Sequence, residues 1–191
     1  AIGWAGIADA APITKQVKLQ VIQLCDNSGA DCAVVNTYEA AADKIWAQAG
    51  VDMLFLPTIT WKNSTFLTPN ANIGQELTMF DQGTVFNDPA VTGIINVFFV
   101  KDLLYSGGTL YGEGCGAPIF ASACNNEVGV VINATDVNSF NGGIGRIDTV
   151  AHEVGHVLGL THETMGAGVA DNLMTAGTSR TVPSGLADIT P

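Results

Sequence analysis

The three histidines of this 191-residue chain lie within one stretch of eleven residues, at the spacing of a metal site. His152 and His156 are four residues apart, so on an α-helix they share one face and lie about 6 Å apart along the axis. His162 follows six residues later and can supply a third imidazole. Three protein ligands leave the fourth position of a zinc ion open for water, which is the arrangement of catalytic and not of structural zinc.

Glu153 and Gly159 extend this stretch to the pattern H-E-x-x-H-x-x-G-x-x-H. Glu153 is one residue further round the helix than His152, so it flanks the metal and can act as general base toward a zinc-bound water. Gly159 can adopt a positive φ, end the helix and turn the chain so that His162 reaches the ion. The alternative, a helix whose histidines hold no ion, would bury three imidazoles and a carboxylate without compensation. A non-catalytic structural zinc site would not need Glu153.

Hydrophobic periodicity indicates the elements that must hold this site. The predicted strands cover residues 16–24, 51–58, 93–100, 109–112 and 127–133. The predicted helices cover residues 37–49, 73–81 and 147–159. Asn36 as N-cap, with Glu39 at the capping-box spacing, and Gly50 after the last turn bound the first helix. Because a strand, a helix and a strand follow one another at the start of the chain, the first two strands should be parallel.

The histidine pattern resembles the signature of the metzincin clan of zinc metallopeptidases, whose members add a methionine-containing turn after the third histidine. Met174, twelve residues beyond His162, is the candidate for that turn. The resemblance implies an α+β fold in which a twisted mixed β-sheet and two main helices form an upper subdomain, about residues 1–160. A small irregular lower subdomain, about residues 161–191, follows, and the active-site cleft lies between the two. The whole chain, 1–191, would be a single metallopeptidase catalytic domain.

The same resemblance implies a protein or peptide substrate that lies extended and pairs with an edge strand of the sheet. We expect the following residues to bind it: Thr109, Leu110, Tyr111 and Gly112. Residues 175–182 would form one wall of the pocket for the side chain that follows the scissile bond. Glu163 follows the third histidine, as in the astacins, but Ala176 stands where astacins carry a tyrosine. We therefore assign the clan and no family within it.

The four cysteines form two close pairs along the chain, Cys25 with Cys32 and Cys115 with Cys124. Of the three possible pairings, the two local ones fit the spacing best, and four reduced, buried thiols are the alternative. Disulfides would place the protein in an oxidising compartment, so we expect it to be secreted. Residues 1–11 lack the basic segment of a signal peptide, and we take the chain as a mature or trimmed form.

Composition excludes two classes of partner. With 18 acidic and 7 basic residues the net charge is −11, the opposite of a nucleic-acid-binding footprint. The apolar runs are too short for a membrane-spanning helix, so we expect no membrane insertion. We also expect a monomer. Calcium is a second candidate ion, without a spaced loop pattern to support it, at Asp81, Asn87, Asp88 and Asp102.

The sequence thus predicts a secreted zinc endopeptidase that hydrolyses peptide bonds with a zinc-bound water activated by Glu153. Two other classes stay open. One is a catalytically silent, zinc-dependent binding or adhesion module on a metzincin scaffold, against which the intact Glu153 argues. The other is an adhesin or surface-layer module, which predicts that no zinc is bound.

Overall fold

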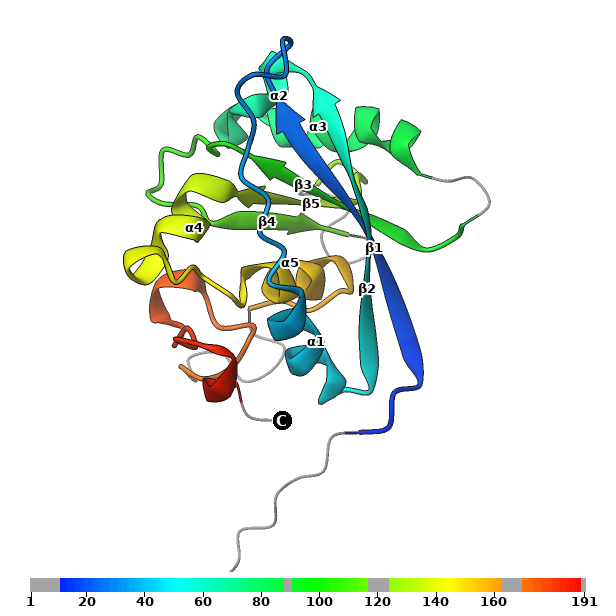
Figure 1. Ribbon diagram of the computed structural model, residues 1–191, viewed down its shortest axis with the longest axis vertical. Coiled ribbons are helices and arrows are strands. Elements are labelled where there is room, and N and C mark those ends of the chain that lie inside the picture. The colour runs from blue at the N-terminus through cyan, green and yellow to red at the C-terminus, as the bar shows by residue number, and fades with distance from the viewer. Residues whose placement is uncertain (1–10, 88–90, 117–123, 163–169, 190–191) are drawn as a thin grey trace, which may run out of the picture.

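The computed structural model describes residues 11–87, 91–116, 124–162 and 170–189, and it is built on one twisted five-stranded sheet (Figure 1). The strand order is β2-β1-β3-β5-β4. Neighbouring strands run parallel except β4, which pairs antiparallel with β5 at one edge. The strands are β1 (Lys15–Cys25), β2 (Val51–Lys62), β3 (Ile94–Val100), β4 (Gly112–Cys115) and β5 (Gly129–Asn133). The prediction of an α+β fold with a mixed sheet is confirmed.

The central strand β3 is buried on both faces, which explains its uninterrupted apolar sequence. Val97 and Phe99 belong to the hydrophobic core on one face of the sheet. Phe98 and Val100 belong to a second core on the opposite face. Successive side chains of a strand point to opposite faces, so one run of aliphatic and aromatic residues supplies both cores.

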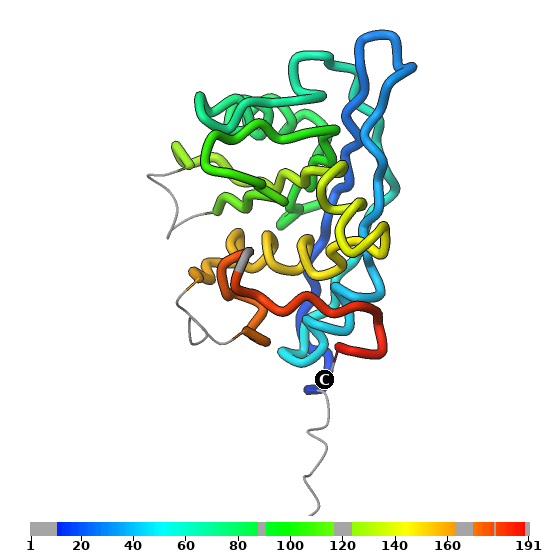
Figure 2. Tube along the Cα trace, turned by 90° about the vertical axis from the view of Figure 1, so that its left-hand side faces the viewer, coloured from blue at the N-terminus to red at the C-terminus, as the bar shows by residue number. Residues whose placement is uncertain are grey.

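Helices cover both faces of the sheet (Figures 1 and 2). On one side, α1 (Glu39–Ala47) packs against β2 and α5 (Thr149–Val157) packs against β4 and β5. The indole N–H of Trp46 donates to the carbonyl of Ala151 and joins these two helices. The remaining helices are α2 (Ser64–Leu67), α3 (Gln75–Gly83) and α4 (Ala134–Gly143), with 3₁₀ turns at Ala71–Ile73, Thr84–Phe86, Gly177–Ser179 and Leu186–Asp188.

Two predicted boundaries are wrong, the start of the first helix and the bounds of the edge strand. Helix α1 begins after Tyr38, whose φ is 49°, and the Asn36 side chain accepts from the Tyr38 backbone N–H instead of capping the helix. The edge strand predicted at 109–112 is instead β4, which begins at Gly112. Glycine is depleted in strands, so the sequence Gly-Glu-Gly-Cys does not predict a strand. Immediately before β4, the Tyr111 carbonyl still accepts from the Asn133 N–H at 2.9 Å.

At the other edge of the sheet, β2 is interrupted by an irregularity at Pro57. The pairing with β1 shifts between Gln20, opposite Leu56, and Ile22, opposite Ile59. Proline lacks the N–H that a strand ladder uses, so it is confined to edges and bulges. The Gln20 side chain donates to the Pro57 carbonyl at 2.8 Å, which satisfies that carbonyl where the ladder is broken.

Disulfides join Cys25 to Cys32 and Cys115 to Cys124, which confirms the prediction of disulfide bonds. The second of them lies at the end of β4, so it fixes the edge strand next to α5. No helix in the described part of the chain combines the length and the apolar character needed to cross a membrane.

Candidate active site

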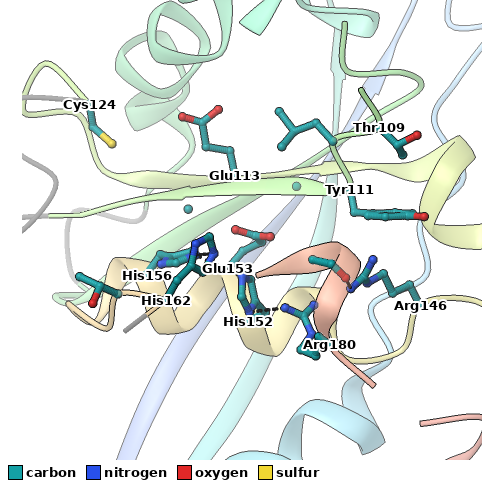
Figure 3. Close-up of a pocket in the computed structure, with 15 residues that line it drawn as sticks. Thr109, Tyr111, Glu113, Cys124, Arg146, His152, Glu153, His156, His162 and Arg180 are labelled. Carbon is teal, nitrogen blue, oxygen red and sulfur yellow. Dashed lines mark hydrogen bonds between the residues drawn. The ribbon is translucent and has the colours of Figure 1, made fainter. Parts of the chain in front are cut away.

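The three histidines converge beside α5 (Figure 3). His152 and His156 lie on the helix, which ends in a Schellman motif at Gly159, with a φ of 92°. Two backbone hydrogen bonds define this motif. The Leu160 N–H donates to the Gly155 carbonyl, and the Gly159 N–H donates to the His156 carbonyl. This turn brings His162 back to the helix, as the glycine in the sequence pattern predicts.

The spacing of the imidazole nitrogens matches one shared ion. The Nε2 atom of His156 lies 3.2 Å from that of His152 and 3.2 Å from that of His162. Two nitrogens bound tetrahedrally to one zinc at its usual bond length of about 2.05 Å would be about 3.3 Å apart. Within the described residues, these histidines form the only group of three or more side chains able to share a metal.

Backbone carbonyls lie against two of the rings. Nδ1 of His152 is 2.5 Å from the Leu173 carbonyl oxygen, and Nδ1 of His156 is 2.8 Å from the Leu160 carbonyl oxygen. A ring that carries its proton on Nδ1 can donate to such a carbonyl and turn the lone pair of Nε2 toward the other rings. Lone pairs held this close repel one another unless a cation lies between them. The donor set therefore fits a zinc ion.

Loss of hydration, which is greatest at the buried His152 and His156, favours the neutral imidazoles that a metal ligand needs. Burial and, after it, the positive charge of Arg180 lower the pKa of His152 to about 2. The pKa values of His156 and His162 are lowered mainly by the same loss of hydration.

Glu153 lies between α5 and β4, beside the histidines and outside their cluster (Figure 3). Its side chain is 5% exposed. Burial raises the pKa of Glu153 to about 8, while the charge of Arg180 acts in the opposite direction. A carboxyl group with such a pKa is suited to accepting and returning a proton near neutral pH.

Three glycines at alternate positions let β4 approach α5 closely. A β-carbon at Gly112 would lie 2.9 Å from Cγ of Glu153. At Gly114 it would overlap the Glu153 backbone carbonyl oxygen, and at Gly116 the carbonyl oxygen of Val157. Only glycine permits this contact between strand and helix. This role was not predicted, although glycine at every second position from 112 to 116 is a signal for it.

Met174 packs beneath the histidine helix. It is 1% exposed, and a β-carbon at Gly155 would lie 2.7 Å from its sulfur. The Asn172 side chain accepts from the Met174 N–H at 2.9 Å and shapes the turn that carries it. Residues 170–189 run alongside α5 in Figure 2. This arrangement is what the predicted methionine turn requires, and its role stays a prediction.

Met174→Leu is expected to change little, because the side chain fills space and is not a ligand. Volume-conserving exchanges of this kind cost below about 1.5 kcal/mol in the free energy of unfolding. Denaturant unfolding and zinc analysis of the purified variant check this, with zinc content expected to stay near that of the unaltered protein. Loss of zinc in this variant would mean that Met174 contributes more than packing.

A buried arginine ties the methionine turn to the start of α5. Arg180 donates from Nε to the Asp148 carboxylate at 2.6 Å and from Nη1 to the Thr175 carbonyl at 3.0 Å. Its Nη1 also lies 2.5 Å from Nδ1 of His152, where its charge opposes protonation of that ring. Arg180 could not be predicted from the sequence, because nothing local links it to α5, which begins 31 residues earlier at Thr149.

The site opens into a cleft of about 630 Å³ between β4 and α5. All four residues predicted to bind substrate line it, although only Gly112 belongs to β4. Whether they contact a peptide stays a prediction. The lining comprises Thr109, Leu110, Tyr111, Gly112, Glu113, Gly114, Cys124, Arg146, His152, Glu153, His156, Thr161, His162, Gly177 and Arg180.

Two further predictions concern residues that lie wholly or partly outside the part of the chain that the structure describes. Glu163 lies outside them, as does Asp88, one of the four candidate calcium ligands. Within the described part of the chain, no acidic cluster that could hold calcium accompanies the histidine group.

Two of three comparisons with known proteins give matches, one with a family model and one with solved structures. A family model described as metallo-peptidase family M12B, reprolysin-like, matches residues 17–163. Among solved structures, the chain is similar to archaemetzincin from Archaeoglobus fulgidus complexed with malonate, with 17% sequence identity and a TM-score of 0.43. That match covers 91% of this chain and 90% of the other. No curated protein matches the sequence.

Proposed function

This chain belongs to the reprolysin-like metallopeptidases of family M12B, and we propose that it is a secreted zinc endopeptidase with Glu153 as its general base. Family membership makes it a metzincin-type, zinc-dependent peptidase that acts on proteins or peptides. The proposal adds the proton-transfer role of Glu153, the zinc ligands, cleavage within the substrate chain, and secretion. We treat residues 1–191 as one catalytic domain.

The observation that carries the proposal is the convergence of three Nε2 atoms beside one buried carboxylate. His152, His156 and His162 would hold the ion. When bound, zinc polarises a carbonyl group and lowers the pKa of water. The three histidines and Glu153 line the same cleft, so substrate and general base would meet there.

Glu153 would take one proton from the attacking water while the water oxygen bonds to the scissile carbonyl carbon. When the carbon–nitrogen bond breaks, Glu153 returns that proton to the leaving amine, so the carboxylate is restored. Its burial, which raises its pKa to about 8, supports this double role. Among the described strands β4 pairs only with β5, and its other edge could hydrogen-bond an extended peptide.

Secretion, monomeric state and the absence of a nucleic-acid partner are further parts of the proposal. Two disulfides support an oxidising compartment. The net charge of −11 argues against binding of a polyanion.

The test combines metal analysis with a peptidase assay. The purified protein is expected to carry one zinc per chain and to cleave casein within its sequence. A chelator should abolish cleavage, and added zinc should restore it, because the three imidazoles alone supply no Lewis acid. Zinc without cleavage would instead indicate a silent binding or adhesion module. A protein that binds no zinc would contradict the proposal altogether.

A further inference from the structure

We propose that the cleft selects substrates with a carboxylate directly after the scissile bond, and that Arg146 is the residue that binds it. The inference rests on the proposed function and deepens it by naming a substrate class. It is carried by one observation: two arginines, Arg146 and Arg180, line the cleft next to Glu153, and they share one carboxylate buried behind them, that of Asp148.

Arg146 is held rigidly at this wall. It lies three residues before α5, and its guanidinium stacks 4.3 Å above the ring of Tyr111. Its Nη2 donates to the Gly177 carbonyl at 2.6 Å. In Figure 3, Arg146 and Arg180 lie on one side of Glu153, and His156 and His162 lie on the other. A side chain entering this part of the cleft would meet a guanidinium that is already oriented.

The charge of Arg146 is poorly compensated. Asp148 is hydrogen-bonded to Nε of Arg180 at 2.6 Å, but its distance to Nε of Arg146 is 3.9 Å, too long for a hydrogen bond. Both the Arg146 Nε and one Asp148 oxygen lack a hydrogen-bond partner although they are buried. The other partners of Arg146, the Gly177 carbonyl and the rings of Tyr111 and Phe140, are neutral.

A buried cation without a full counter-charge favours an incoming anion. Arginine stays charged when buried, and its planar fork matches a carboxylate in a bidentate geometry. Among the described ion pairs, none joins Arg146 to Glu113 or Glu153, although the charge of Arg146 acts on Glu153 from a longer distance. Substrate glutamate or aspartate would supply what the wall lacks, whereas lysine would be repelled.

The position of the bound substrate carboxylate relative to the scissile bond follows from the chain segment that lies beside Arg146. Gly177 and Arg180 line the cleft. Both lie within residues 175–182, which we expect to form the wall of the pocket for the residue after the scissile bond. The selected carboxylate is therefore either the side chain of that residue or, if the substrate ends there, its terminal carboxylate.

Two pairs of quenched fluorescent peptides test this with the unaltered zinc-loaded protein. The first pair carries Glu or Gln after the cleavage site, with amidated ends. The second pair ends at that position with a neutral side chain and a free or an amidated terminus. We expect kcat/KM to favour the carboxylate by about tenfold to a hundredfold, the effect of a hydrogen bond to a charged group. A preference in the first pair assigns the side chain as ligand, and one in the second pair assigns the terminus.

Two variants assign the preference to Arg146. In the Arg146→Gln variant, the ratio of kcat/KM between the two peptides of the discriminated pair should fall close to one, whatever the absolute activity of the variant. Lys101→Gln also removes one positive charge, from an exposed pair with Asp31 outside the cleft, and should keep the ratio. If casein is cleaved but neither peptide pair is discriminated, this inference is wrong and the proposed function stands. If neither casein nor any peptide is cleaved, the proposed function itself is wrong.

Discussion

Glu153→Ala is expected to lower peptide turnover by roughly 10²–10⁴-fold, the contribution of general acid–base catalysis, while zinc stays bound. The carboxylate is not one of the three converging donors, and the rings that are donors are held by the carbonyls of Leu173 and Leu160. The loss should therefore fall on kcat. Zinc stoichiometry and turnover of a quenched peptide, measured on the same preparation, separate metal binding from proton transfer.

His156→Ala is the matched control, because it removes a donor and leaves Glu153 in place. The Nε2 atom of His156 lies 3.2 Å from the Nε2 atom of each of the other two histidines. Without this central donor, zinc and activity should be lost together. The assignment of Glu153 would be contradicted by either of two results. One is a Glu153→Ala protein that retains most of its activity. The other is a Glu153→Ala protein that loses zinc as His156→Ala does.

Gly114→Ala is expected to abolish activity and to destabilise the fold. Gly114 is not among the residues with positive φ, so the backbone itself would accept alanine. The added methyl group would overlap the Glu153 backbone carbonyl oxygen, and neither a strand nor a helix backbone can move aside as a side chain can. Overpacking costs typically about 1–3 kcal/mol of unfolding free energy, and a backbone clash belongs at the upper end.

Gly185→Ala serves as the control for this substitution. Gly185 has an extended backbone, and a β-carbon there meets nothing within 4 Å. Urea unfolding and peptide turnover of both variants give the comparison: Gly185→Ala should match the unaltered protein. Normal stability and activity in Gly114→Ala would show that β4 does not press against α5 as described.

The part of the site that could be predicted from the sequence is the part built by local geometry. The positions of His152, His156 and Glu153 follow from the helical repeat alone. The turn at Gly159 follows from the conformational freedom of glycine. Each of these lies within one short segment, where spacing along the chain determines position in space.

The supporting contacts could not be predicted, because they join segments that are distant along the chain. Arg180 and Asp148 are 32 residues apart, and Arg146 and Gly177 are 31 apart. No periodicity links such pairs, since they meet only after the sheet has formed. The start of α1 was missed for a different reason: the side chain of Asn36 binds the Tyr38 N–H, a turn that competes with helix capping.

The two edges of the sheet differ in their risk of pairing with another copy of the chain, which is the first step of β-aggregation. The long edge strand β2 carries Pro57 and a shift of register, both of which prevent continuous pairing. The edge at β4 has no such protection, but it spans only four residues and is tied at its end by the Cys115–Cys124 disulfide. With a net charge of −11, copies also repel one another. The two edges therefore limit pairing between copies in different ways, β2 by its proline and register shift and β4 by its short length.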